Sequence, residues 1–137
     1  MQRKFLLTTA SVWVSNMWVR KQHGPAADTR GGNEERWHWY TSGESAADIL
    51  ALTNNDIVNI DLNDAPSGVT VEQQVDSKRE LPSATGVIDI KTFLSALRKI
   101  GFDGPIRAEP FNAELRKLPK EQALAATIAS LRKAFAA

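Results

Sequence analysis

The stretch that decides the fold is IDIKTFLSALRKIGFDGPIRAE, residues 88–109. Its apolar side chains follow the i, i+3, i+4, i+7 spacing of a helix with one buried face: Ile90, Phe93, Leu94, Leu97 and Ile100. Asp89 is placed to cap the first turn, and Gly101 stands where a left-handed residue commonly ends a helix. A turn over 102–105 then leads into a short apolar strand, 106–109, which Pro110 ends.

The same alternation continues on both sides of this stretch. Residues 45–52 are predicted to form a helix, and residues 57–62, which are short, apolar and β-branched, a strand. After Pro119, a final amphipathic helix carries the stripe Leu124, Ile128, Leu131 and Phe135. Strands alternating with such helices indicate parallel βα units. Two or three units are too few to close a barrel of eight strands, which takes about 250 residues.

Two segments fall outside this pattern. Residues 1–36 are predicted to be a divergent, irregular N-terminal segment, because 22–36 is polar and Gly-rich, and the regular domain is placed at 37–137. Arg3 and Lys4 precede a short apolar run as in a signal peptide, but polar residues interrupt that run. Residues 63–87 are a long loop, and loops of that length within a domain are usually functional.

Composition excludes several classes of protein. Lys plus Arg number 17 and Asp plus Glu 16, so a net charge of +1 argues against a nucleic-acid surface. The absence of cysteine excludes a disulfide framework and a thiolate metal site, and it fits a cytoplasmic location. No apolar run approaches the roughly 20 residues of a membrane span.

Candidate site residues follow from the rule that ligands of parallel α/β sheets bind at the carboxyl ends of the strands. This rule selects Asp61 and Asp64 after one strand and Glu109 after the other, with Arg79 in the loop between them. Asp64, before Ala-Pro, is equally a turn residue, and an arginine such as Arg79 in a charged loop is more often a solvated surface charge. Glu109 ends a buried strand, so its carboxylate must be paired, protonated or metal-bound.

His38 is a further candidate, because it lies between two tryptophans, Trp37 and Trp39. The three rings fit a packed aromatic cluster. They fit a sugar site equally well, because flat rings stack on the apolar faces of sugars.

From Trp37 onward the chain resembles the sugar phosphate isomerase/epimerase superfamily, which has the xylose isomerase-like TIM barrel. The matching pieces are WHWYTSG at 37–43, IVNIDLNDAPSG at 57–68, DSKR at 76–79, LP at 81–82, GVID at 86–89 and IGFDGP at 100–105, followed by EPF at 109–111. The resemblance implies the C-terminal part of that barrel, about its last three βα units, and a chain expected to be truncated.

The resemblance also implies roles for individual residues. Glu109 matches a glutamate that is both metal ligand and acid/base catalyst, His38 a sugar-binding histidine, and Arg79 a substrate arginine. Trp37 is expected beside the substrate. The expected metal, Mg or Mn, takes oxygen ligands, and the expected ligands in this chain are Glu109, Asp61 and Glu35.

Three departures from the family pattern stand out. Asp61 occupies the position of a metal-binding histidine, and Glu35 that of an aspartate. The glutamate expected after the fifth strand has no counterpart.

The function implied by the resemblance is metal-dependent isomerisation or epimerisation of a sugar or polyol derivative, with weak or no activity expected of this chain alone. The alternative is a non-catalytic remnant, a self-associating assembly module or one half of a split barrel. In either case the Ile57 strand is expected to lack its usual neighbour on one side. Exposed strand edges pair with other chains, so a homo-oligomer or a second chain supplying the missing strands is expected.

Overall fold

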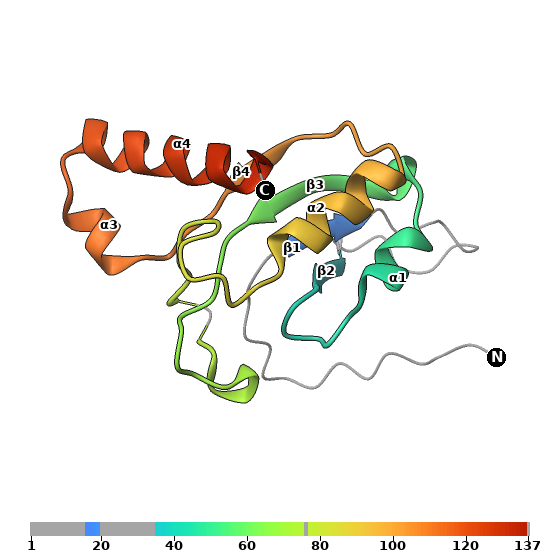
Figure 1. Cartoon of the computed structure of the whole chain (residues 1–137), viewed down its shortest axis with the longest axis horizontal. Coiled ribbons are helices and arrows are strands. Elements are labelled where there is room, and N and C mark those ends of the chain that lie inside the picture. Colours follow the sequence, from blue (N-terminus) through green and yellow to red (C-terminus); the bar gives the residue numbers. More distant parts are fainter. Residues whose placement is uncertain (1–15, 20–34, 76, 137) are drawn as a thin grey trace, which may run out of the picture.

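A computed structural model of the chain describes residues 16–19, 35–75 and 77–136, with only the backbone considered for 16–19 and 35–38. Its elements are β1 Asn16–Val19, β2 Glu35–His38, α1 Ala46–Leu50, β3 Ile57–Leu62, α2 Ile90–Lys99, β4 Ile106–Ala108, α3 Ala113–Lys117 and α4 Lys120–Ala136. Short 3-10 turns lie at Asn54–Asp56 and Val71–Gln73. In Figure 1, α1 and α2 lie in front of the sheet, and α4 extends away from it beside β4.

The sheet has the order β2-β1-β3-β4. β3 and β4 pair in parallel, as expected of consecutive βα units, and the fold is a partial α/β barrel. β1 was not predicted, and it pairs antiparallel with both β2 and β3. The Ile57 strand was expected to lack its usual neighbour on one side; the antiparallel strand β1 lies there, so that side of β3 is paired. Within the described part of the chain, the edges of the sheet are β2 and β4.

The core forms between the sheet and α2, as residues 88–109 predicted. Phe93, Leu94 and Leu97 are buried against Ile60 and Leu62 of β3. The same core includes Trp39, whose ring centroid lies 5.2 Å from that of Phe93 at an interplanar angle of 51°. Both predicted ends of the helix are confirmed. The Asp89 carboxylate accepts the Thr92 N–H at 3.0 Å, and Gly101 has a φ of +72°.

Asp64 organises the long loop that follows β3. Its buried carboxylate accepts four backbone N–H groups: those of Ala65 and Ile88 at Oδ1, and those of Thr85 and Gly86 at Oδ2, at 2.8–3.0 Å. Its backbone also forms a two-hydrogen-bond antiparallel bridge with Glu80. Asp64 therefore stabilises the turn, which was one of its two predicted roles. Its bridge to Glu80 also fixes the backbone position of Arg79, the residue before Glu80.

The last helix departs from the pattern of its sequence. Leu131 and Ala134 pack against the core, but the rest of the predicted stripe is exposed: Leu124 by 61%, Ile128 by 39% and Phe135 by 43%. No helix in the described residues is long and apolar enough to cross a membrane. The sequence periodicity of α4 therefore marks an apolar surface that is only partly covered.

Candidate functional site

The structure brings Arg79 and Glu109 together, although they lie 30 positions apart. Glu109 follows β4 directly, and its N–H donates to the Leu62 carbonyl at 3.2 Å, which holds it beside the end of β3. Arg79 Nη1 donates to Glu109 Oε2 at 2.5 Å. The arginine side chain is 3% exposed and the glutamate 32%, so solvent and small molecules reach the carboxylate but hardly the guanidinium.

Aromatic and amide side chains hold this pair in place. The Arg79 guanidinium lies 4.6 Å from the centroid of the Phe111 ring, in cation–π range. Next to it, Asn112 Nδ2 donates to Glu80 Oε2 at 2.5 Å, while the Asn112 side-chain oxygen caps α3. The loops after β3 and β4 are thus joined by two adjacent side-chain contacts. Phe111 belongs to a matching sequence piece, but neither it nor Asn112 was predicted to have a role.

Asp61 forms a second ion pair, with Arg107 on the neighbouring strand. The two residues are register partners across the parallel β3–β4 pair. Arg107 donates through Nε to Asp61 Oδ1, and through Nη2 to Asp61 Oδ2 at 3.2 Å. The Asp61 side chain is fully buried, whereas that of Arg107 is 62% exposed.

This pairing has an electrostatic effect on Arg107. The hydrogen bonds to Asp61, and then the negative charge of Asp61, raise the pKa of Arg107 further above its usual value, with a smaller contribution from Glu109. Sequence reasoning missed Arg107, although an arginine inside a short apolar strand was itself a signal.

The strand register places the three residues predicted in or beside β2. β2 runs parallel to β3 because two antiparallel pairings separate them, so His38 ends β2 at the same edge as Asp61. Both residues are register partners of Asn16, which puts their Cα atoms two strand spacings, about 10 Å, apart. Trp37 precedes His38 by one residue.

Glu35 lies at the other end of the sheet. It is level with Ile57, four residues from Asp61, so their Cα atoms are about 16 Å apart. The structure therefore brings His38 to the candidate site by its backbone position, but it does not bring Glu35 there.

The described side chains do not fit the divalent metal implied by the resemblance. In the part of the chain that the structure describes, no group of three or more His, Asp or Glu side chains could hold a metal ion. Two of the predicted ligands, Asp61 and Glu109, are engaged by guanidinium groups. A hard cation binds through the negative charge of carboxylate oxygens, and a paired guanidinium offsets that charge. The carboxylates at this site, Asp61 and Glu109, are both in salt bridges.

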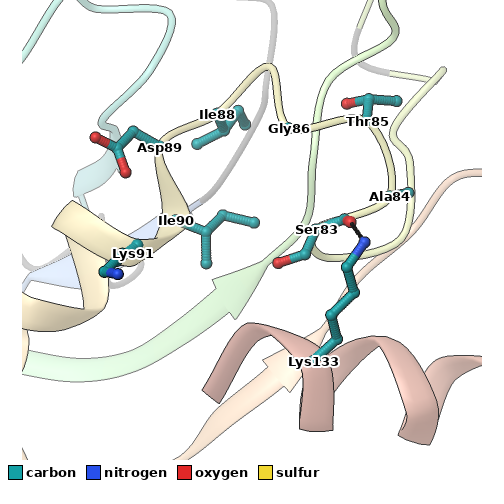
Figure 2. A pocket seen from close by; sticks show the side chains of 9 residues that line it. All are labelled: Ser83, Ala84, Thr85, Gly86, Ile88, Asp89, Ile90, Lys91 and Lys133. Carbon is teal, nitrogen blue, oxygen red and sulfur yellow. Dashed lines mark hydrogen bonds between the residues drawn. The ribbon is translucent and has the colours of Figure 1, made fainter. Parts of the chain in front are cut away.

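Two hollows lie in the surface of the described part of the chain, and the second is bordered by Glu80 and Asn112, next to the Arg79–Glu109 pair. One, of about 420 Å³, is lined by the 83–91 segment and by Lys133, whose Nζ donates to the Ser83 carbonyl at 2.6 Å (Figure 2). The other, of about 390 Å³, lies between the 80–84 segment, α3 and α4, and its lining includes Leu81, Leu115 and Leu118. None of the predicted site residues lines either hollow, so the candidate site is the open cluster at the strand ends.

A comparison of the sequence with known protein families gives a result that is consistent with the parallel pairing of β3 and β4 and with the matching sequence pieces. The profile described as "Xylose isomerase-like TIM barrel" matches residues 17–134. The chain belongs to this family. The match begins inside the segment predicted to be divergent, and it covers β2 and all of β1 except Asn16. Searches of curated proteins and of solved structures found no match.

Proposed function

We propose that this xylose isomerase-like chain binds a sugar or polyol derivative at the carboxyl ends of β3 and β4, in support of an isomerase or epimerase reaction. The observation that carries the proposal is the Arg79–Glu109 pair, a carboxylate that is about one-third exposed, held by a buried guanidinium at the position where such barrels bind ligands. A fixed carboxylate open to solvent on one side is suited to proton transfer with a bound small molecule.

The proposed roles follow from the geometry. Glu109 takes the proton from a carbon next to a carbonyl group, and the C–H electrons move into the carbonyl to form an enediolate. Returning the proton to the former carbonyl carbon, while the hydroxyl proton of the neighbouring carbon passes to the former carbonyl oxygen, gives isomerisation. Protonation of the original carbon on its opposite face, by water or a second acid, gives epimerisation. Arg79 orients Glu109 and is therefore a positioning residue. His38 and Trp37 are proposed to contact the sugar from β2.

Activity of the chain alone is expected to be weak or undetectable, so the test must register single proton transfers. Purified protein is incubated with D-xylose, D-fructose and myo-inosose in deuterated water, and deuterium incorporation is followed by NMR. Slow exchange that Glu109→Gln abolishes supports the proposal. General-base catalysis is worth about 10²–10⁴-fold, so the loss should be of that order.

Two further variants sharpen the test. Arg79→Lys keeps the positive charge but not the planar, multi-donor geometry of the guanidinium. It should slow deuterium exchange without abolishing it. Glu114→Gln is the matched control, because Glu114 is an exposed carboxylate on α3 that pairs only with Lys117 among the described residues. If none of the three sugars binds or exchanges in the parent chain, this proposal fails.

A second candidate is a self-associating module, favoured by the exposed side chains of α4 and the open edge of β4. A sheet edge beside an apolar helix face can be covered by the same surface of a second copy.

A cytoplasmic location is also proposed, and the cysteine-free sequence supports it.

A further inference from the structure

Within the two described ion pairs of the candidate site, the charges balance without any added cation. Asp61 and Glu109 each contribute one negative charge, and Arg107 and Arg79 each contribute one positive charge. A fully buried carboxylate such as Asp61 requires a counter-ion, because an uncompensated buried charge is strongly destabilising. Among the described residues, that counter-ion is the guanidinium of Arg107, which pairs with Asp61, the residue that the resemblance implies as a metal ligand.

We infer that Arg107 is the resident cation of this site, which binds the oxygens of its sugar or polyol ligand through a guanidinium group and without a divalent metal. The inference rests on the proposed function for the identity of the ligand. Its claim about metal stands on the ion pairs alone.

The guanidinium has donors to spare for this role. An arginine has five N–H donors, and Arg107 uses Nε and one Nη2 N–H on Asp61. The remaining donors have no other partner among the described residues, and the side chain is 62% exposed. Asp61 accepts hydrogen bonds from the Nε and Nη2 edge of the guanidinium. The opposite edge is thereby held in a fixed orientation toward solvent.

The position of Arg107 relative to Glu109 suits one small ligand. Residues two apart in an extended strand project to the same side, and their Cα atoms lie about 7 Å apart. The negative charge of Glu109 also contributes to the raised pKa of Arg107. A sugar bound there would present an oxygen to the guanidinium and a neighbouring carbon to the carboxylate. Negative charge developing on that oxygen is stabilised by a fixed positive group.

The claim about metal is tested without any sugar. Mn²⁺ is titrated into the parent chain and into Asp61→Asn, and free Mn²⁺ is followed by electron paramagnetic resonance. We expect no stoichiometric binding by the parent at micromolar protein, and a melting temperature that EDTA does not change. One Mn²⁺ bound per chain in the micromolar range, weakened about tenfold or more by Asp61→Asn, would overturn the inference.

The role of the guanidinium is tested with D-xylose, D-fructose and myo-inosose by saturation-transfer NMR, in EDTA and then in excess MgCl₂. We expect equal binding in both conditions and a loss of about tenfold or more in Arg107→Gln, which is the size of one charged hydrogen bond. Arg132→Gln, an exposed arginine on α4, is the matched control and should bind as the parent does. Sugar binding that requires Mg²⁺ would refute the inference while leaving the proposed function intact.

A folding control separates this role from stability. Arg107→Gln leaves Asp61 buried without its counter-ion and should lower the melting temperature, whereas the double variant Asp61→Asn/Arg107→Gln should recover most of the loss. If only the double variant folds, its sugar affinity tests the role of Arg107. We expect it to bind sugar about tenfold more weakly than the parent. Binding as tight as that of the parent would refute a role for Arg107. If no sugar binds the parent in either buffer, the proposed function fails and the Mn²⁺ titration alone decides the claim about metal.

Discussion

Replacing Asp64 by asparagine should destabilise the fold far more than an ordinary carboxylate-to-amide change. Each Asp64 oxygen accepts two buried backbone N–H groups, so the new amide nitrogen faces two donors whichever way the side chain is turned. Two charge-assisted hydrogen bonds are lost, at about 1.5–3 kcal/mol each, so we expect a loss of about 3–6 kcal/mol. Domains are stable by only about 5–15 kcal/mol, which makes this a large fraction of the total.

Urea unfolding followed by tryptophan fluorescence measures the effect. At an m-value of about 2 kcal/mol/M, the midpoint should fall by about 1.5–3 M. Glu114→Gln is the control: it makes the same chemical change in an exposed i,i+3 ion pair and should cost less than about 0.5 kcal/mol. A loss below about 1 kcal/mol for Asp64→Asn would refute the reasoning, because it would mean that the four contacts do not hold the loop.

Three further outcomes are expected. The double variant Leu124→Ser/Ile128→Ser removes exposed apolar side chains from α4 and should shift any oligomer toward monomer in light scattering, with little change in melting temperature. Gly101→Ala forces a side chain into a left-handed conformation (φ +72°) and should cost about 1–2 kcal/mol in urea unfolding. Hydrogen bonds from the Ser45 backbone and hydroxyl lower the pKa of Asp48 below its usual 3.8. Its contribution to stability is thus present above about pH 4 and is lost as the pH falls further, so Asp48→Asn should flatten the acid limb of a stability–pH curve.

The elements that sequence predicted well are those whose periodicity and caps agree. Residues 88–109 predicted α2, its Asp89 cap and its left-handed Gly101, because local propensity and burial specify the same helix. The 57–62 strand has the bounds that were predicted. α4 was predicted as a helix but misjudged in its packing, since an apolar stripe indicates that a face is to be covered and not what covers it.

The parts that sequence could not predict depend on pairing between distant segments. β1 lies in a stretch without regular period, and its position between β2 and β3 follows only from strand register. Arg79 and Glu109 were both predicted as site residues, but a charge on a loop does not reveal its partner thirty residues away. Asp61 was predicted as a ligand because it lies at the end of a strand and matches the position of a metal ligand in the family, and its partner Arg107, in the next strand, was not considered.

The two arginines of the site differ in a way that argues for different roles. Arg79 is buried, stacked on Phe111 and paired with a carboxylate more exposed than itself, as expected of a group that positions another. Arg107 has the reverse arrangement, with a fully buried carboxylate and an exposed guanidinium. A counter-ion that served stability alone would be expected to bury its own apolar stem as Arg79 does, because side-chain packing adds to what the charge supplies. The exposure of Arg107 leaves its outer donors open to solvent, where a ligand oxygen can reach them.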